Sequence, residues 1–451
     1  MTSNTLFRIL AGLAGLVALS GCAERLGLVP AAPKSAAIVV GDEPYAVKAA
    51  ADVMAQGGDA VDAATALYFA LSVTYPVAAG LGGGGICLVR NPAMNQTQEF
   101  DFLARDSIGK GEFAVPGNVR GFAVMHAAYG ALPWQRVIAA SEGYAATGFP
   151  ISQALATRLA ASENVVRLDA GLAAEFMDES GHVKPAGSIV SNRDLAETLT
   201  AIRTQGFSGF YSGLTAAKIV TYSSAQGSII TAPELATYPV TQSYASTMRF
   251  GDQSVFLPRQ SIGSGAFAGT LFDNLRRELN AGHEGSNTEG AVVAATKQAL
   301  SAYGVANLPG DLGSTGFAVM DKNGEAVACA VTMNGPFGSG HSAQGSGVTL
   351  AKAPSSGQAG LAAAFLIPVL ATDGDNHVLL AGAGAGGPIG TASIADALAR
   401  LSKGEVVTRR GKAGDRNVAL YDTVNAILCQ EGSCSALLDA GANGLGASPG
   451  G

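Results

Sequence analysis

Charged residues are scarce in this sequence. They make up 14% of the 451 residues, well below the roughly 25% of an average soluble protein. The 28 basic and 35 acidic residues give a net charge of −7, and no run of basic residues is longer than Arg409–Arg410. Binding to a phosphate backbone needs a concentrated positive patch. The composition therefore argues against nucleic acid as a partner.

Histidine is also rare, with five in the chain. None lies near a Gly-x-Ser-x-Gly motif, which excludes a Ser-His-Asp hydrolase of the nucleophile-elbow type. No cysteine or histidine spacing typical of a metal site occurs. Of two Gly-x-Gly-x-x-Gly patterns, the one at Gly80 follows a helix and the one at Gly382 has no βαβ unit before it, so neither favours a nucleotide site. We expect no metal and no cofactor.

Hydrophobic residues and glycine are plentiful instead. Hydrophobic residues reach 48%, enough for a large core, and the 60 glycines are nearly twice the usual share of about 7%. Near-continuous apolar strands at 317–320, 326–333 and 378–381 indicate sheets covered on both faces. Two further strands are predicted at 86–90 and 97–103. Helical periodicity occurs at 45–55, before these strands, and across most of 119–279, after them. The order is helix, sheet, sheet, helix.

The N-terminus has the features of an export signal. One positive charge, Arg8, precedes the apolar run Ile9–Leu19, which is too short to span a bilayer, and small residues lead to Cys22. Small residues before a cysteine resemble the bacterial lipoprotein processing box. We expect residues 1–21 to be removed and Cys22 to be lipidated, which would anchor a periplasm-facing lipoprotein in the bacterial cell envelope. The alternative is an ordinary exported cysteine.

The other apolar stretch and the other cysteines have local explanations. Residues 60–80 include Asp62, Ser72 and Pro76, so a buried core helix is expected rather than a membrane span. In an oxidising compartment the cysteines at 429 and 434 could close a small disulfide loop, or remain two thiols. Those at 87 and 329 lie in apolar strand-like runs and are interpreted as small buried hydrophobes.

The segment 310–340 is the most informative. Asp321-Lys322-Asn323-Gly324 predicts a hairpin turn with glycine in the left-handed position. That turn sets a register in which Ser314 faces Thr332, and alternation puts Asn334 on the same face. On spacing alone, an ordinary polar strand end is the better explanation.

The same segment resembles the nucleophile segment of γ-glutamyltranspeptidases, which are N-terminal-nucleophile hydrolases. The likeness extends over most of the chain. Its motifs are Gln56-Gly57-Gly58-Asp59-Ala60-Val61-Asp62-Ala63-Ala64, Gly80-Leu81-Gly82-Gly83-Gly84-Gly85, Val115-Pro116-Gly117, Tyr129-Gly130-x-Leu132-Pro133-Trp134, Gly148-Phe149-Pro150, Phe210-Tyr211-Ser212-Gly213, Ser314 to Val327, Thr332-x-Asn334 and Phe337-Gly338-Ser339-Gly340.

The resemblance implies an α/β fold, a four-layer αββα sandwich in one globular unit, and a chain that cuts itself before the nucleophile. Residues 22–313 would form a large, helix-rich chain and residues 314–451 a small chain, together a heterodimer. The new α-amine, with a pKa of roughly 7.7–8.0, can take the hydroxyl proton of its own residue. By resemblance Thr332 would hydrogen-bond the nucleophile, Asn334 would help to hold the substrate, and Gly386-Gly387 would supply oxyanion N–H groups.

The sequence departs from the family pattern at several site positions. Ser314 stands where the family has threonine, which keeps the chemistry, and Gly316 stands where it usually has histidine. The paired serines that bind the substrate carboxylate align with Ala364 and Phe365, and the aspartate that binds its amine aligns with Ser356. The carboxylate-binding arginine is displaced, and Arg105 is the nearest candidate. An unmodified γ-glutamyl group should therefore bind poorly.

Two hypotheses follow. The first is a self-processing amide hydrolase or acyltransferase with an N-terminal serine nucleophile, acting on a γ-glutamyl compound such as glutathione or on a related acyl amide. The second is a catalytically silent binding lipoprotein on the same scaffold. Ser314, Thr332, Asn334 and the glycine pair favour the first.

Overall fold

The computed structural model describes residues 37–261, 263–281, 288–304, 311–405, 407, 423–430, 433–438 and 443–449. The predicted signal peptide and Cys22 lie outside these ranges. Within them, no helix is both long and apolar enough to cross a bilayer. The apolar stretch that begins at Ala60 forms α3 (Ala60–Thr74), which is buried along its whole length. The prediction of a core helix is confirmed.

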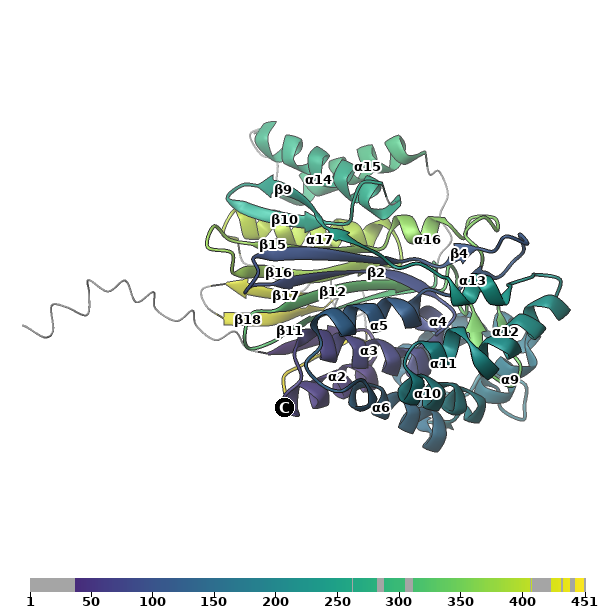
Figure 1. Ribbon diagram of the computed structural model, residues 1–451. Coiled ribbons are helices and arrows are strands. Elements are labelled where there is room, and N and C mark those ends of the chain that lie inside the picture. The colour runs from purple at the N-terminus through teal and green to yellow at the C-terminus, as the bar shows by residue number, and fades with distance from the viewer. Residues whose placement is uncertain are drawn as a thin grey trace, which may run out of the picture. The chain divides into compact units, whose positions relative to one another are not determined.

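Two antiparallel sheets lie at the centre of the fold (Figure 1). The first has seven strands in the order β19-β1-β11-β12-β2-β3-β8, and the second has six in the order β18-β17-β16-β15-β10-β9. The strands of the first sheet are β1 (Ile38–Gly41), β2 (Gly84–Asn91), β3 (Gln96–Phe102), β8 (Thr241–Tyr244), β11 (Ser314–Met320), β12 (Ala326–Thr332) and β19 (Leu445–Ala447). Those of the second are β9 (Ser246–Phe250), β10 (Gln253–Leu257), β15 (Ile367–Thr372), β16 (Val378–Ala385), β17 (Thr423–Gln430) and β18 (Ser433–Leu438).

Helices cover the outer face of each sheet (Figure 1). The first sheet packs against α2 (Pro44–Ala55), α3, α5 (Asn118–Tyr129) and α6 (Trp134–Thr147), and the second against α14 (Gly263–Ala281), α15 (Thr288–Tyr303) and α17 (Pro388–Ser402). A third apolar cluster fills the space between the sheets. The fold is therefore the four-layer αββα sandwich expected from the sequence.

The remaining elements are short or lie beside the sandwich. They are α4 (Pro76–Ala79), α7 (Gln153–Ala161), α8 (Glu163–Leu168), α9 (Ala170–Phe176), α10 (Arg193–Gln205), α11 (Ser208–Tyr211), α12 (Gly213–Ala225), α13 (Ala232–Ala236), α16 (Leu361–Ala364), β4 (Arg105–Asp106), β5 (Ala114–Val115), β6 (Phe149–Pro150), β7 (Ile189–Val190), β13 (His341–Ala343) and β14 (Val348–Leu350).

The side-chain alternation of β11 explains why its sequence is apolar throughout. Phe317 and Val319 point into the cluster under the helices, whereas Ala318 and Met320 point into the cluster between the sheets. Because successive residues of a strand face opposite sides, a strand covered on both faces needs apolar residues at every position. The small Ala318 leaves room for the second sheet to approach.

The predicted β11–β12 hairpin is confirmed. Gly324 has φ +81°, and the backbone N–H of Asp321 donates to the carbonyl of Glu325 at 3.0 Å. The register pairs Met320 with Ala326 and, at the far end, Ser314 with Thr332. The turn alone therefore brings these two hydroxyl residues together.

Two predictions need correction. The segment predicted to be mostly helical, 119–279, contains the strands β8, β9 and β10. The half-exposed, largely polar residues of β8 and β9 carry little strand signal, whereas β10 is mostly buried. The cysteines at 87 and 329 are buried, as expected, but they form a disulfide instead of packing as separate thiols. A second disulfide joins Cys429 and Cys434 across neighbouring positions of β17 and β18, which is the loop that the sequence allowed.

Candidate active site

Ser314 is the first residue of β11 and is only 1% exposed. Its hydroxyl oxygen accepts a hydrogen bond from the backbone N–H of Gly386 at 2.9 Å. Gly386 and Gly387 connect β16 to α17, and Pro388 occupies the first turn of that helix. The predicted nucleophile therefore meets the predicted oxyanion loop at the N-terminus of a helix, where backbone N–H groups favour negative charge.

The carbonyl oxygen of Gly313, immediately before the predicted nucleophile, has two donors. The N–H of Met333 lies 2.8 Å from it and the Thr332 hydroxyl 3.1 Å. In this continuous chain the Thr332 hydroxyl thus donates to the carbonyl before Ser314, a different partner from the predicted Ser314 side chain. Its oxygen also accepts from the backbone N–H of Asn334 at 2.8 Å, which fixes its orientation.

Glycine is required at position 313. Its φ is +61°, in the left-handed region. A Cβ atom there would lie 1.9 Å from the carbonyl oxygen of Gly335, which no real contact permits. The backbone on the N-terminal side of Ser314 is therefore held in a conformation that other residues could not adopt.

A largely buried ion pair that the sequence analysis missed holds the backbone on both sides of the Gly313–Ser314 peptide. Arg158 of α7 bonds Asp311 Oδ2 through Nε at 3.0 Å and Ser314 O through Nη1 at 3.2 Å. Asp311 Oδ1 in turn accepts from the N–H of Gly313 at 2.7 Å. Burial lowers the pKa of the Arg158 guanidinium, but Asp311 and Tyr75 raise it more, so this pKa lies above its usual range. Arg158 is the only charged residue of α7, and a single charge in an otherwise uncharged helix is the sequence feature that could have indicated a buried ion pair.

A second missed network holds the residues after the nucleophile. Thr315 donates its hydroxyl to Asp42 Oδ2 at 2.6 Å. Asn425 Nδ2 donates to Asp42 Oδ1 and to the carbonyl of Gly316, both at 2.8 Å. The network joins β17 of the second sheet to β11 of the first, and it gives Thr315 a structural partner. This leaves Ser314, rather than its neighbour Thr315, as the candidate nucleophile.

The glycine at 316, where the family usually has histidine, has a packing explanation. A Cβ atom on Gly316 would lie 2.7 Å from the Cβ of Ala383 on β16. The two sheets approach too closely here for any side chain. The departure from the family pattern therefore accompanies a local contact between the sheets.

The predicted substrate-binding residues lie in neighbouring loops. Asn334 is buried, and its side-chain amide donates to the Lys352 carbonyl at 2.8 Å. The guanidinium carbon of Arg105, on β4, lies 5.3 Å from the centre of the Tyr238 ring. Ser356 is half-buried in a turn. The hydroxyl of its neighbour Ser355 donates to the carboxylate of Asp106, the residue after Arg105. Lys352 pairs with the strand segment just before β5, which completes this loop cluster.

Phe365, which aligns with one of the family's carboxylate-binding serines, has its side chain in the core of this protein. The ring is 0% exposed and packs edge-on against Phe267 of α14, 4.9 Å between ring centres. Phe365 belongs to the core between the second sheet and its helices. Its neighbour Ala364 is buried in the same cluster. Hence neither residue offers a side chain that could bind a carboxylate.

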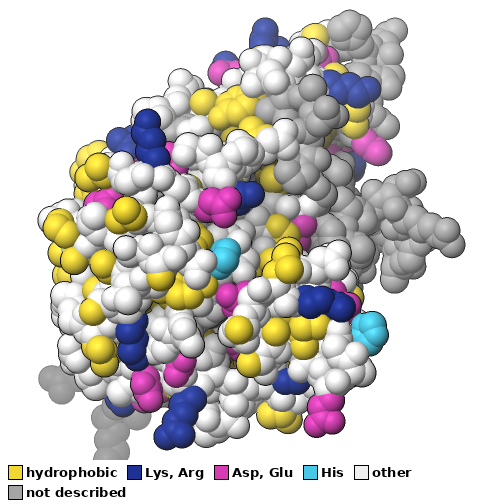
Figure 2. Space-filling model, turned by 90° about the vertical axis from the view of Figure 1, so that its right-hand side faces the viewer, with side chains coloured by type: hydrophobic (Ala, Val, Ile, Leu, Met, Phe, Trp, Pro, Cys, Tyr) yellow, Lys and Arg dark blue, Asp and Glu magenta, His cyan; other side chains and the backbone are white. Residues whose placement is uncertain are grey.

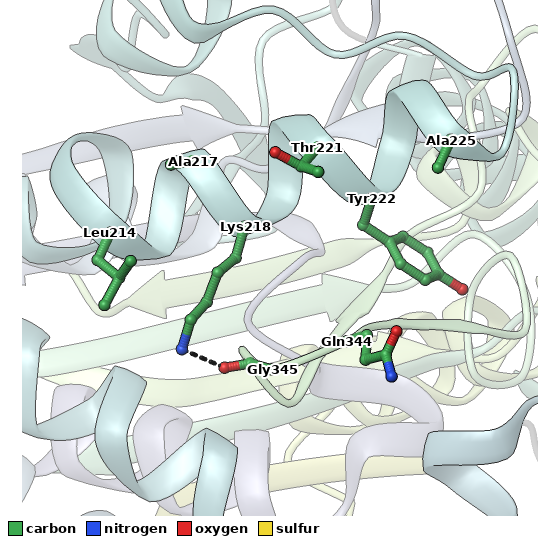
Figure 3. Close-up of a pocket in the computed structure, with 8 residues that line it drawn as sticks. All are labelled: Leu214, Ala217, Lys218, Thr221, Tyr222, Ala225, Gln344 and Gly345. Atoms are coloured by element: carbon green, nitrogen blue, oxygen red, sulfur yellow. Dashed lines mark hydrogen bonds between the residues drawn. The ribbon is translucent and has the colours of Figure 1, made fainter.

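Two grooves lie outside the nucleophile region. The first, of about 490 Å³, runs between α12 and the loop that carries Gln344 and Gly345, with Lys218 and Tyr222 reaching across it (Figure 3). The second, of about 630 Å³, shares Tyr222 with it and is also lined by Glu175, whose pKa burial raises to about 7. Figure 2 shows charged side chains scattered over one face rather than gathered in one patch. Neither groove is lined by a predicted site residue.

One cluster of the described residues has metal-ligand chemistry. Ligand atoms of Asp373, Asp375 and His377 lie within 4.8 Å of one another on the turn between β15 and β16. The Asp373 carboxylate accepts from the backbone N–H groups of Asp375 and His377, which builds the turn. We assign no metal to it.

Comparisons with known proteins identify the family. A sequence profile described as Gamma-glutamyltranspeptidase matches residues 46–302, more than half of the chain. The chain belongs to the γ-glutamyltranspeptidase family. The matched residues end before Ser314, so the nucleophile itself rests on the motifs and geometry given above.

Individual relatives agree with this family. The glutathione hydrolase proenzyme of Pseudomonas aeruginosa is 33% identical over 242 residues, which cover 48% of this chain and 42% of that protein. Glutathione hydrolase 2 of Arabidopsis thaliana is 30% identical over 231 residues, covering 48% and 40%. The chain thus spans less than half of the length of these relatives.

Solved structures agree with the fold. Cephalosporin acylase from Bacillus halodurans superposes with a TM-score of 0.73 at 16% identity, covering 92% of this chain and 96% of that one. γ-Glutamyltranspeptidase from Helicobacter pylori gives a TM-score of 0.53 at 25% identity, covering 58% and 81%. This chain therefore has the fold of an N-terminal-nucleophile hydrolase.

Proposed function

We propose that this family member is a self-processing amide hydrolase or acyltransferase whose nucleophile is Ser314, freed by cleavage of the Gly313–Ser314 bond. The observation that carries the proposal is the pair of donors on the Gly313 carbonyl. Met333 N–H and the Thr332 hydroxyl both bind this oxygen in the uncut chain. Preorganised donors at an atom that gains negative charge are the usual way in which proteins lower the barrier of acyl transfer.

Self-cleavage would begin with an N-to-O acyl shift. The Ser314 hydroxyl oxygen bonds to the Gly313 carbonyl carbon, its proton passes to the Ser314 nitrogen, and the C–N bond breaks. The charge that develops on the carbonyl oxygen is stabilised by Met333 and Thr332. Water then hydrolyses the resulting ester, which leaves a carboxylate on Gly313 and a free hydroxyl and α-amine on Ser314.

Turnover would use the same residue in its mature form. The α-amine, with a pKa of roughly 7.7–8.0, takes the hydroxyl proton as the oxygen attacks the substrate amide. The N–H groups of Gly386 and Gly387, at the start of α17, bind the oxyanion of the tetrahedral intermediate, and Asn334 holds the substrate. The proton then passes to the leaving amine, and water or an acceptor amine releases the acyl group.

The acyl group of the substrate is inferred from the relatives and from the charges of the residues near the site. The relatives named glutathione hydrolase suggest a γ-glutamyl amide as the starting point. Ser356, Ala364 and Phe365 carry no charge to pair with a glutamyl carboxylate or amine, and Arg105 lies against Tyr238. A charged acyl group without partners binds weakly, so we propose a less charged acyl amide as the preferred substrate.

A catalytically silent binding protein on the same scaffold is the competing function. Ser356 and Ala364 stand where the family has residues that bind the amine and the carboxylate of the substrate. Their loss favours the silent protein, because a protein that no longer binds the substrate no longer needs its catalytic residues. The hydrogen bonds around Gly313 and Ser314 favour the enzyme. A panel of γ-glutamyl and neutral acyl anilides, assayed with wild type and Ser314→Ala, distinguishes the two functions. Turnover by the wild type that is lost in Ser314→Ala would support the enzyme. Absence of such turnover for every anilide would support the silent binding protein.

We also propose that the protein is exported and held on a membrane of the bacterial cell envelope by acylated Cys22. Two or more acyl chains suffice for stable anchoring. Wild type should partition into detergent and Cys22→Ser into the aqueous phase. Aqueous partitioning of the wild type would reject the anchor.

A further inference from the structure

The disulfide between Cys87 and Cys329 spans the proposed cleavage site. Cys87 lies on β2 and Cys329 on β12, directly opposite each other in the antiparallel register. The two residues are 242 positions apart, and the Gly313–Ser314 bond lies between them in the sequence. Cleavage of that bond would put one cysteine in each product.

We infer that the two chains produced by self-cleavage remain covalently joined through Cys87–Cys329, an inference that rests on the proposed cleavage. The other described disulfide cannot serve, because Cys429 and Cys434 both follow Ser314. The mature protein is therefore a disulfide-linked heterodimer, in which each chain also contributes strands to both sheets.

The position of the bond connects it to the active site. Cys329 is three residues before Thr332 on β12, and Thr332 pairs with Gly84 of β2 on one side and with Ser314 of β11 on the other. The disulfide thus holds the strand that carries Thr332 against a strand of the large chain. After cleavage β11 loses its covalent connection at Gly313, so this bond becomes the covalent tie between the nucleophile's hairpin and the large chain.

Formation of the bond requires both the folded sheet and an oxidant. Closing it removes two electrons and two protons from the two thiols, and a disulfide-bearing oxidant of an oxidising compartment accepts them and becomes a dithiol. Both sulfur-bearing side chains are 0% exposed in the cluster under the helices. Once formed, the bond is shielded from soluble thiols, and only unfolding makes it accessible to them.

The test is denaturing electrophoresis of the purified full-length protein after alkylation of free thiols, with and without reductant. We expect two fragments with reductant and one species without it, whose intact mass is that of the uncut chain plus one water. The double variant Cys87→Ala/Cys329→Ala should give two fragments in both lanes. The matched control, Cys429→Ala/Cys434→Ala, should behave as wild type.

The outcomes separate this inference from the proposed function. Two fragments without reductant in the wild type would overturn the linkage and leave self-cleavage standing. One species in both lanes would contradict self-cleavage, and with it the two-chain product. Because cleavage needs the folded site, fragments from the Cys87→Ala/Cys329→Ala variant under reducing conditions also report that it folds. If that variant stays linked without reductant, another bond joins the chains and the assignment is wrong.

Discussion

The hydroxyl oxygen of Ser314 accepts a hydrogen bond from the backbone N–H of Gly386, although the two residues are 72 positions apart. Ser314 begins a strand of the first sheet, and Gly386 directly follows a strand of the second. The bond crosses the space between the sheets at the point where β16 turns into α17. It joins the first residue of one strand to the start of a helix. The proposed chemistry depends on this junction and on the backbone just before Ser314.

The buried ion pair next to that backbone should be important for stability. Arg158→Gln leaves the Asp311 carboxylate, whose side chain is only 10% exposed, without its guanidinium partner. Loss of one partner of such a largely buried pair typically costs about 3–5 kcal/mol. The free energy of unfolding, measured by urea denaturation of uncut Ser314→Ala protein, should fall by that amount. Arg167→Gln breaks an exposed pair with Glu163 and serves as the control, with no measurable change expected. Equal stabilities for both variants would contradict the role of Arg158.

The conformation of Gly313 should be needed for cleavage. In Gly313→Ala the new Cβ would meet the Gly335 carbonyl at 1.9 Å, so the backbone must move and the rate of fragment formation should fall at least about tenfold, equivalent to about 1.4 kcal/mol. Gly324→Ala is the matched control, since it also has positive φ but open space around its Cβ position. It should lose about 1–2 kcal/mol of stability and still cleave. Normal cleavage of Gly313→Ala would show that this conformation does not matter.

Local patterns made part of this arrangement predictable. The turn Asp321–Gly324 sets the β11–β12 register within a few residues, so the meeting of Ser314 and Thr332 could be predicted. The polar edge strands β8 and β9 could not, because their exposed side chains carry no period that distinguishes them from a loop or helix.

Contacts between segments that are distant in the sequence could not be predicted. The partner of Cys329 depends on β12 lying beside β2, and the partner of Arg158 depends on α7 packing near the start of β11. The orientation of Phe365 depends on the second sheet and α14. Each of these contacts joins two segments that are far apart in the sequence, and no local motif shows that they lie side by side.

The substrate pocket can be tested at two positions with opposite expectations. Ser356→Asp places a carboxylate in a half-buried turn and should raise kcat/KM for a γ-glutamyl anilide at least about tenfold, because a hydrogen bond to a charged group contributes about 1.5–3 kcal/mol. Ser356→Asn, similar in shape but uncharged, should not. Phe365→Ser should instead destabilise the fold by about 3–5 kcal/mol by leaving a cavity beside Phe267. A low KM of the wild type for the γ-glutamyl anilide would contradict the altered specificity.

Stability should fall as the pH rises through the titration of Glu325. Burial, followed by the nearby Asp59 and Asp321 carboxylates, raises the pKa of Glu325 to about 8. The folded protein therefore holds this proton more tightly than the unfolded chain, so its contribution is fully present below about pH 4.5 and is lost as the pH rises to about 8.

The test is the pH dependence of thermal unfolding between pH 5 and pH 9. Glu325→Gln, which cannot ionise but keeps an oxygen for Asn91, should be more stable than wild type at pH 9 by on the order of 2 kcal/mol and similar to it near pH 5. Glu179→Gln, at an exposed position, is the control and should follow the wild-type curve. If the stability of wild type and that of Glu325→Gln change with pH in parallel, the proton on Glu325 is not the cause of the stability loss at high pH.

The central claim, that Ser314 becomes an N-terminal nucleophile, is tested most directly by the intact mass and N-terminal sequence of reduced, purified protein. Wild type should yield a fragment that begins Ser-Thr-Gly-Phe at residue 314 and a fragment that ends at Gly313. Ser314→Thr, which keeps a hydroxyl, should still be cut, whereas Ser314→Ala should remain one chain. Uncut wild type after prolonged incubation, or equal cleavage in Ser314→Ala, would contradict the account.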